Sequence, residues 1–518
     1  MSMSALQTES IIGVIGAGAM GAGIAQVAAA AGHPVKLFDA AEGAAEHGLA
    51  GIAKGLEKLL ARGRITAADR DALLARIEPV AALAELAPAA LVIEAIIERL
   101  EVKQQVFAEL ESICTAEAIL ASNTSSLSIT AIGAALQRPE RLVGMHFFNP
   151  APVMKLVEVI SGLASDAAVA ETVFATASRW GKLAVHARST PGFIVNRVAR
   201  PFYAEALRLL QEGAADAATI DAVMREAGGF RMGPFELMDL IGHDVNYAVT
   251  RSVYEAYCQD PRFKPSLIQR ELVDGGFLGR KSGRGFFDYR QSAAAGAAIP
   301  DAQTAEACHA PKEILLFGDP GIAAPLVETI RRAGITVNPA PENDDGLLLS
   351  VGGARIALSD GRSATERCPQ GTGNLVLLDL ALDFAACPRV ALTAADQADP
   401  AALDDAVGLM QAAGKQVSLV DDAPGMIVTR TVCMLANEGA DAVHQRVCDA
   451  AAVDTAMRGG VNYPRGPMSW ADGIGADRVL KVLDNLAAHY GDGRYRASPL
   501  LRRVVARGGC FIQTKGEQ

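Results

Sequence analysis

The chain has 518 residues, about three typical domain lengths, so we expect several domains rather than one core. Half of the residues are hydrophobic and 21% are charged, a composition that argues against intrinsic disorder. The formal net charge of -11 provides no basic field for nucleic acid. The sequence shows no apolar run of membrane-spanning length, no signal-peptide pattern and no CxxC pair among its eight cysteines. We therefore expect a protein of the reducing cytoplasm, without a membrane or nucleic-acid partner.

A glycine-rich turn opens the chain. The apolar segment 11–15 predicts a buried strand, which runs directly into the turn and then into an alanine-rich helix. The first glycine suits the tight turn, the second lets a pyrophosphate approach the backbone, and the third lets the helix pack on the strand. Free N–H groups at the helix start would face the phosphates. The candidate cofactor-binding residues of this turn are Gly16, Gly18, Ala19, Met20 and Gly21.

An acidic residue follows at the position that contacts the ribose in dinucleotide-binding folds. The predicted strand 35–39 ends in Asp39, whose carboxylate can bond both ribose hydroxyls of NAD and repel the 2′-phosphate of NADP. Glycine turns also occur for packing alone, but strand, helix and Asp39 together favour NAD. Further strands at 90–96 and 118–123, with a helix at 97–111 between them, predict a doubly wound α/β sheet of the Rossmann type.

A histidine and a glutamate stand in two neighbouring apolar runs. His146 ends the first, and Glu158 lies inside the second, where a carboxylate is costly to bury unless it is paired. The turn at 149–152 can fold the second run back so that the two side chains meet. The carboxylate would then fix the imidazole, whose other nitrogen could take a proton from an alcohol. The residues alone equally allow a core histidine and an unrelated edge-strand charge.

In its first 290 residues the sequence resembles the 3-hydroxyacyl-CoA dehydrogenases. The motifs that carry the resemblance are GAGAMGAGIAQVAAAAGH, VIEAIIERLEVK, ASNTSSLSIT, GMHFFNPAPVMKLVEVI, TPGFIVNR, GPFELMDLIG and GRKSGRGFFDY. The resemblance implies a cytoplasmic oxidoreductase of the fatty-acid β-oxidation type, which oxidises an (S)-3-hydroxyacyl-CoA thioester to the 3-ketoacyl-CoA with NAD. This chemistry needs no metal, and the sequence has no metal-ligand pattern.

The resemblance also implies roles for particular residues. His146 would be the general base, Glu158 its orienting partner, and Ser125 and Asn196 the side chains that hydrogen-bond the substrate's 3-oxygen. Two further positions match family residues near the cofactor, and either of two lysines could serve in place of the family's CoA-holding lysines. They are Glu98 and Lys103 near the cofactor, and Lys54 and Lys58 as alternatives for holding the CoA moiety.

The second half of the chain contains an internal repeat. The segment 190–197 (TPGFIVNR) recurs 233 positions later as 423–430 (APGMIVTR), and the same offset holds as far as Gly242 and Gly475. The second copy has Ala391 and Thr429 where the first has a glutamate and an asparagine. A glycine turn at 318–321 lacks the third glycine and contains a proline. We expect this copy to be structural rather than cofactor-binding.

These patterns predict an α/β Rossmann-type domain and an all-α helical domain, followed by a degenerate second copy of both. The second helical domain could replace, within one chain, the dimer interface of shorter family members, giving an intrachain pseudo-dimer; the alternative is an ordinary homodimer. The predicted segments are 1–189 for the NAD-binding domain, 190–290 for the helical domain, 291–311 for a linker, 312–421 for the shortened Rossmann-like domain and 422–518 for the second helical domain.

The acyl chain of the substrate is left open by the sequence. The long two-copy form is similar to dehydrogenases that act on 3-hydroxyadipyl-CoA in phenylacetate breakdown, beside an enoyl-CoA hydratase and a thiolase; 3-hydroxybutyryl-CoA is the alternative. The far carboxylate of a dicarboxylyl substrate needs a cation, for which Arg200 and Arg231 are candidates. A non-enzymatic NAD-binding protein is disfavoured because all four catalytic positions are retained. A lysine-base dehydrogenase would need lysine at Asn196.

Overall fold

The computed structural model describes residues 4–290, 299–342, 346–368 and 373–512. Residues 291–298 of the predicted linker lie outside this range, and residues 299–311 have neither helix nor strand. The chain divides into two compact units. The first is the chain up to Arg197 together with Gln445–Val461, and the second is Val198–His444 together with the chain from Asn462 onward. Within the described residues, no helix is both long and apolar enough to cross a membrane.

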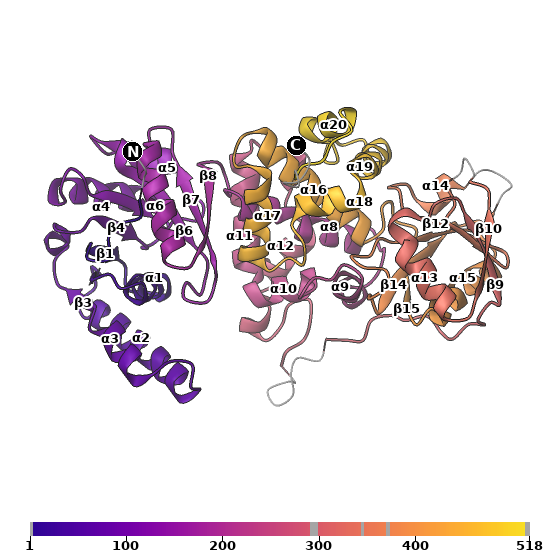
Figure 1. Ribbon diagram of the computed structural model, residues 1–518, viewed down its shortest axis with the longest axis horizontal. Coiled ribbons are helices and arrows are strands. Elements are labelled where there is room, and N and C mark those ends of the chain that lie inside the picture. Colours follow the sequence, from indigo (N-terminus) through magenta and orange to yellow (C-terminus); the bar gives the residue numbers. More distant parts are fainter. Residues whose placement is uncertain (1–3, 291–298, 343–345, 369–372, 513–518) are drawn as a thin grey trace. The chain divides into compact units, whose positions relative to one another are not determined.

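The first unit is built on an eight-stranded sheet in the order β3-β2-β1-β4-β5-β6-β7-β8 (Figure 1). The strands from β3 to β6 are parallel, β7 is antiparallel to β6, and β8 is parallel to β7. The predicted doubly wound Rossmann sheet is confirmed. Its strands are β1 (Ile12–Ile15), β2 (Val35–Phe38), β3 (Ile77–Val80), β4 (Leu91–Glu94), β5 (Ile119–Ser122), β6 (Leu142–Phe147), β7 (Leu156–Ser161) and β8 (Leu183–Arg188).

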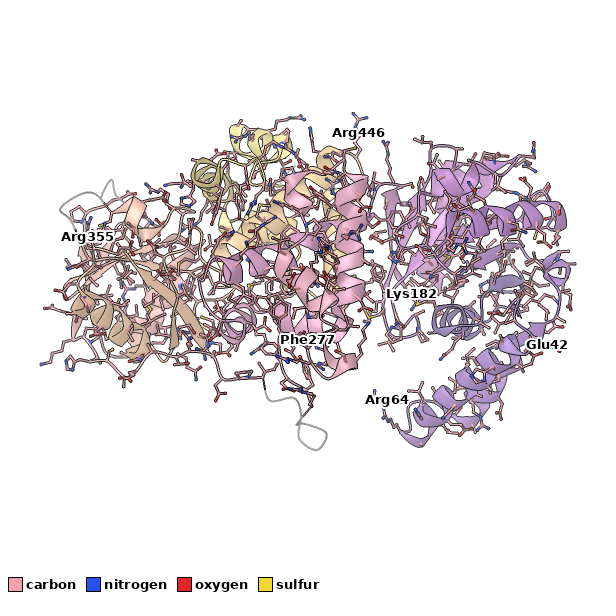
Figure 2. The ribbon with its side chains drawn as sticks, turned by 180° about the vertical axis from the view of Figure 1, so that it is seen from behind. Glu42, Arg64, Lys182, Phe277, Arg355 and Arg446 are labelled. Atoms are coloured by element: carbon pink, nitrogen blue, oxygen red, sulfur yellow. The ribbon has the colours of Figure 1, made fainter. Side chains whose placement is uncertain are left out.

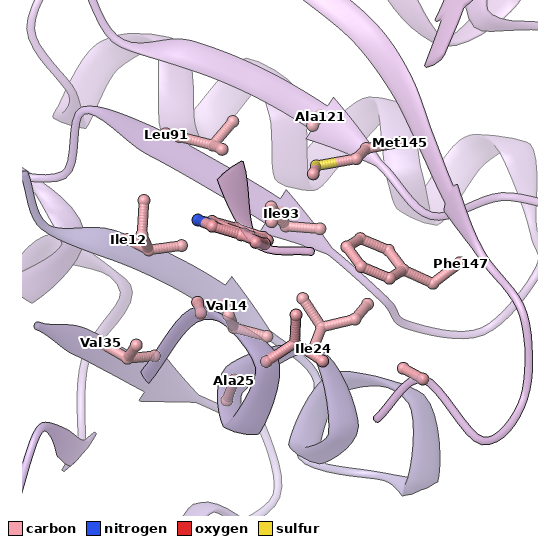
Figure 3. Close-up of a cluster of buried hydrophobic side chains, with 14 of the residues drawn as sticks. Ile12, Val14, Ile24, Ala25, Val35, Leu91, Ile93, Ala121, Met145 and Phe147 are labelled. Carbon is pink, nitrogen blue, oxygen red and sulfur yellow. The ribbon is translucent and has the colours of Figure 1, made fainter. Parts of the chain in front are cut away.

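Apolar side chains from the strands and from α1 form the core of this unit. Ile12, Val14 and Ile93 on the central strands pack with Ile24 of α1 and with Phe147 at the end of β6 (Figure 3). The helix expected at 97–111 begins later, at Leu100, because Arg99 still has an extended backbone and residues 97–99 lead into the helix. The helices are α1 (Ala19–Ala30), α2 (Ala44–Ala61), α3 (Ala67–Leu74), α4 (Leu100–Ile113), α5 (Ile129–Gly133), α6 (Ala167–Arg179) and α7 (Val195–Val198).

The two helical copies repeat with the offset seen in the sequence. Helices α9, α10 and α11 begin 233 positions before α17, α18 and α19. The copies differ where α7 and α8 of the first copy correspond to one helix, α16, in the second, because Pro201 cannot donate to the preceding turn. The helices are α8 (Arg200–Gln211), α9 (Ala217–Glu226), α10 (Pro234–Ile241), α11 (His243–Ala256), α12 (Leu267–Asp274), α16 (Val428–His444), α17 (Ala450–Val461), α18 (Pro467–Ile474), α19 (Ala476–Tyr490) and α20 (Pro499–Ala506).

A second sheet of seven strands has the order β10-β9-β11-β12-β13-β14-β15. Its last three strands keep the pattern of β6 to β8: β13 and β14 are antiparallel, and β14 and β15 are parallel. The elements are β9 (Glu313–Phe317), β10 (Thr336–Ala340), β11 (Leu349–Val351), β12 (Ala354–Leu358), β13 (Leu375–Leu378), β14 (Arg389–Ala394) and β15 (Gln416–Leu419), with α13 (Ala324–Arg332), α14 (Ala364–Arg367) and α15 (Pro400–Ala412).

Each helical copy places its α9-type helix on the sheet of the other copy. In the second unit α9 packs on β14, and in the first unit α17 packs on β7 and β8 (Figure 1). The backbone N–H of Arg188 donates to the carbonyl of Val447, 2.8 Å away. Gly460 allows close contact, because a Cβ there would lie 2.6 Å from Leu156 and 3.2 Å from Val195. A segment of the second copy therefore completes the packing of the first sheet.

Buried ion pairs join the two helical copies within the second unit. Arg262 of the first copy donates to Glu438 and to Asp441, at 2.9 and 2.5 Å. Arg430 of the second copy donates to Glu205 at 2.9 Å and also to Glu212. The Arg262 and Arg430 side chains are almost completely buried. Removing one partner of such a pair leaves an uncompensated buried charge and costs about 3 to 5 kcal/mol.

Candidate active site

The glycine turn has the geometry predicted for a dinucleotide site. Gly16 has a φ of 94°, which favours glycine. A Cβ at Gly21 would lie 1.7 Å from the carbonyl oxygen of Gly16, so only glycine lets α1 pack on the turn. At Gly18 no atom of the described residues beyond its immediate chain neighbours lies within 4 Å of the place a Cβ would take. The turn is therefore open where a pyrophosphate would approach the first N–H groups of α1, at Ala19 and Met20.

Asp39 lies at the end of β2, next to this turn. Its Oδ2 accepts from the N–H of Ala17 at 2.7 Å, and its Oδ1 accepts from the N–H of Ala41 at 3.0 Å. The two bonds fix the carboxylate beside the start of α1. An acidic group held there fits ribose hydroxyls and opposes a 2′-phosphate, so these residues fit NAD.

The predicted contact between His146 and Glu158 is present. The two residues face each other in the antiparallel register of β6 and β7. His146 Nδ1 lies 2.7 Å from Glu158 Oε2, and both side chains are buried. Since a carboxylate can only accept, Nδ1 carries the proton and donates it to this bond. The Nε2 nitrogen is then left as the proton acceptor.

The same carboxylate anchors the segment that carries Asn196. Glu158 Oε1 accepts from the N–H groups of Ile194 and Val195, each at 3.0 Å, at the start of α7. The next residue, Asn196, donates from Nδ2 toward the carbonyl of Ser125 at a long 3.5 Å. Glu158 therefore fixes the histidine and the asparagine together, and the structure brings Asn196 and Ser125 side by side.

A second carboxylate shapes the loop that carries Ser125. Glu98 Oε1 accepts from Thr124 Oγ1 at 2.6 Å and from the N–H groups of Ser125 and Ser126 at 2.9 and 3.1 Å. Burial acts to raise the pKa of Glu98, but the hydrogen bonds from Thr124 and Ser126 and the charge of Lys103 lower it overall. The loop after β5 is thus held by an ionised side chain.

Lys103 is a buried partner of this carboxylate. Its side chain is 1% exposed and its Nζ lies 2.6 Å from Glu94 and 3.2 Å from Glu98. Its expected place near the cofactor stays a prediction. Glu94, at the end of β4, was not singled out from the sequence, although a glutamate in an apolar strand was a usable signal. It also accepts from Ser122 Oγ at 2.7 Å.

Acidification should release the Glu98 loop. Because the folded-state pKa of Glu98 lies below its ordinary value of 4.5, its stabilisation is present above that value and is lost as the pH falls through the folded-state pKa. We expect Glu98→Gln to lower the free energy of unfolding by about 1 kcal/mol near neutral pH. That difference from the wild type should shrink below pH 4.5 in urea titrations. A difference that does not change with pH would contradict this account.

The CoA candidates Lys54 and Lys58 lie on α2, one turn apart and both exposed. Figure 2 shows Glu42 and Arg64 just beyond the two ends of this helix. The two ammonium groups share one face, which suits a phosphate-rich ligand. The structure does not choose between them. Within the described residues, no group of three or more His, Cys, Asp or Glu is placed to hold a metal ion.

The second copy has an acidic residue where the first has its histidine. Asp379 follows His146 by 233 positions and is 1% exposed. Its Oδ2 accepts from the N–H groups of Ile427 and Val428 at 3.0 and 2.7 Å, and its Oδ1 accepts from Thr429 Oγ1 at 2.8 Å. It anchors α16 as Glu158 anchors α7. Sequence reasoning missed this exchange, although the repeat offset alone could have found it.

The glycine turn of the second copy is closed by its own side chain. Asp319 Oδ1 accepts from the N–H of Gly321 at 2.9 Å, so a carboxylate occupies a donor that a phosphate would need. The following α-helix starts only at Ala324. This geometry agrees with the expected structural role, and the absence of NAD binding at this turn stays a prediction.

Comparison with known proteins shows the family of the chain. The model of the 3-hydroxyacyl-CoA dehydrogenase NAD binding domain matches residues 11–190, and that of its C-terminal domain matches 192–289 and again 425–516. A 3-hydroxybutyryl-CoA dehydrogenase reduced Rossmann-fold domain matches 356–424. The chain belongs to the 3-hydroxyacyl-CoA dehydrogenase family. It is an NAD-dependent oxidoreductase that acts on 3-hydroxyacyl-CoA.

Two curated proteins and one crystal structure illustrate what the chain is similar to. The 3-hydroxyadipyl-CoA dehydrogenase of Escherichia coli is 44% identical over 95% of this chain and 96% of its own. A probable 3-hydroxybutyryl-CoA dehydrogenase of Bacillus subtilis is 44% identical over 54% of this chain and 96% of its own. A crystal structure described as 3-hydroxybutyryl-CoA dehydrogenase from E. coli is 42% identical, with a TM-score of 0.87, and covers 97% of this chain and 99% of that one. The two-copy architecture is therefore shared with relatives.

Proposed function

We propose that this dehydrogenase oxidises 3-hydroxyadipyl-CoA, with His146 as the general base. The base assignment rests on one observation, the 2.7 Å contact of His146 Nδ1 with Glu158. The substrate assignment is supported by the E. coli 3-hydroxyadipyl-CoA dehydrogenase, which matches the chain through both copies. The second candidate, 3-hydroxybutyryl-CoA, is favoured by the names of the Bacillus relative and of the E. coli crystal structure.

The proposed mechanism uses four side chains. Ser125 and Asn196 hold the 3-oxygen of the substrate and orient its hydroxyl toward His146 Nε2. The imidazole takes the hydroxyl proton, and the positive charge that forms is stabilised by Glu158, whose other oxygen stays bonded to the backbone. NAD, when bound, accepts the C3 hydride. The products are a 3-ketoacyl-CoA, NADH and a proton.

The substrate assignment is tested by NADH production from a series of CoA thioesters. The series contains 3-hydroxybutyryl-, 3-hydroxyhexanoyl- and 3-hydroxyadipyl-CoA. We expect the highest kcat/KM for the adipyl thioester. A maximum at the four-carbon substrate would replace the proposed substrate with the second candidate.

The carboxylate at the end of β2 should set the choice of cofactor. We expect Asp39→Ala to raise the Kd for NAD, because the carboxylate that bonds the ribose hydroxyls is gone. The variant should also prefer NAD over NADP by a smaller factor, because nothing at this position repels a 2′-phosphate. Fluorescence titration of both cofactors measures the two constants. A wild-type preference for NADP, or an unchanged ratio in the variant, would refute the role of Asp39.

The cellular setting and assembly are proposals of the same kind. We place the enzyme in the cytoplasm, in phenylacetate catabolism or β-oxidation beside an enoyl-CoA hydratase and a thiolase. We also propose that the two helical copies form an intrachain pseudo-dimer, which the buried Arg262 and Arg430 ion pairs support. Light scattering should then give the mass of one chain, 54.0 kDa. A stable mass of two chains would favour the homodimer instead.

A further inference from the structure

One buried guanidinium in the second unit differs from the others. Arg262 and Arg430 each donate to two carboxylates, as a buried charge requires. Arg200, at the start of α8, is 6% exposed, and no carboxylate of the described residues lies within ion-pair distance of it. Arg200 is therefore a buried guanidinium for which the described residues supply no counter-ion.

The surroundings of Arg200 hold it in place without neutralising it. Its Nη1 donates to Thr250 Oγ1 at 3.1 Å, and its guanidinium carbon lies 4.9 Å from the centre of the Tyr203 ring. Its Nε is buried and has no hydrogen-bond partner within the described part of the chain. Burial lowers the pKa of this group from its ordinary value. A planar, oriented donor with free capacity is suited to an incoming oxyanion.

Arg200 lines a cavity of about 330 Å³, a volume within the range of small-molecule sites. Its walls combine polar groups with the apolar side chains of Leu207 and Phe263. Ser266 also lines it, and its Oγ is buried with no partner among the described residues. Lys264 adds a second cation, and no ion pair involves it in the described ranges.

The remaining charges around the cavity are already balanced. Arg208 pairs with Glu205, Arg494 pairs with Asp492, and Glu212 accepts from Arg430. Two positive charges, those of Arg200 and Lys264, are thus left without a partner beside an apolar wall. This combination matches a ligand that carries an anionic group on a hydrocarbon chain.

We propose that the Arg200 cavity binds a carboxylate carried on a short hydrocarbon chain. One source of this group is the free carboxylate of the dicarboxylyl substrate, in which case the inference rests on the proposed function. The other source is a separate dicarboxylate. The two arms of the test below distinguish these sources. Arg231, the other cation considered from the sequence, is exposed and does not line this cavity.

The first arm of the test compares two substrates on one enzyme preparation. The thioesters 3-hydroxyadipyl-CoA and 3-hydroxyhexanoyl-CoA have the same chain length and differ in a terminal carboxylate or methyl group. We expect Arg200→Met to reduce the ratio of their kcat/KM values about 10- to 100-fold, and Arg200→Lys to restore part of it. Because a ratio is measured, partial misfolding of a variant cancels. Arg251→Met, an exposed change on α11, is the matched control and should leave the ratio unaltered.

The second arm titrates the full-length protein with adipate and with hexanoate by calorimetry. Adipate binding that Arg200→Met abolishes, together with an unchanged substrate ratio, would assign the cavity to a separate dicarboxylate. An unchanged ratio without such adipate binding would overturn the inference, whether or not the activity with both thioesters falls equally. A wild type that prefers 3-hydroxyadipyl-CoA would leave the proposed function standing in those cases. A wild type without that preference would refute the proposed substrate. The inference would then stand only if the protein binds adipate and Arg200→Met abolishes that binding.

Discussion

Replacing His146 with alanine should lower kcat about 10²- to 10⁴-fold and leave the Kd for NAD nearly unchanged. The imidazole is the group that receives the hydroxyl proton, whereas the glycine turn and Asp39 that fit the cofactor are separate from it in the sheet. Steady-state kinetics and a fluorescence titration with NAD measure the two quantities. Near-normal turnover in the variant would exclude His146 as the base.

Glu158→Gln is the informative companion to this change. Glutamine keeps the shape but loses the charge that stabilises the imidazolium, so we expect a smaller but still large fall in kcat. The same side chain also accepts from Ile194 and Val195, so this variant should in addition have a lower melting temperature. His146→Ala leaves these backbone bonds in place but removes the partner of a buried carboxylate, so it should lower the melting temperature as well. An unchanged melting temperature of Glu158→Gln would contradict the double role of Glu158.

Removing the second half should abolish the soluble enzyme. A fragment of residues 1–290 keeps every proposed catalytic side chain but lacks α17, which packs on β7 and β8. It also leaves Arg262 buried without Glu438 and Asp441. Breaking a buried pair costs about 3 to 5 kcal/mol, and a domain is stable by only about 5 to 15 kcal/mol. We expect aggregation, or self-association through the uncovered apolar surface, with residual activity at best.

The control for this truncation supplies the missing second half as a separate chain. Co-expression of residues 1–290 with residues 299–518 should recover soluble, active protein, because the covering helix and the carboxylates are present again. A fragment 1–290 that is monomeric and fully active alone would refute the structural dependence. Calorimetry on residues 311–518 should show no saturable NAD binding. Micromolar binding there would mean that the turn at Asp319 is a working site.

The contact of His146 with Glu158 is one of two arrangements that the two apolar runs and their short turn allow, since a buried glutamate needs a partner. The family resemblance favoured it over an unrelated core histidine and edge-strand charge. Lys103 shows the limit of such reasoning. A motif position near the cofactor does not tell which way a helical side chain points, and this one points to Glu94.

The exchange of α9 and α17 between the two sheets could not be predicted. An amphipathic pattern shows that one face of a helix is buried, but it does not identify the surface that buries it. The repeat offset was readable, and it would have placed Asp379 at the position of His146. What it could not show is that this carboxylate had taken over the anchoring of the following helix.

The bonds of Asp379 oppose the appearance of a histidine–glutamate pair in the second copy. A mutation of this residue to histidine would not recreate a base, because Ala391 supplies no carboxylate to orient it. It would also strip the buried N–H groups of Ile427 and Val428 of their acceptor. Recovery would need simultaneous changes on two strands, each harmful alone. We therefore expect one reaction centre per chain, with a second half that diverges as scaffold.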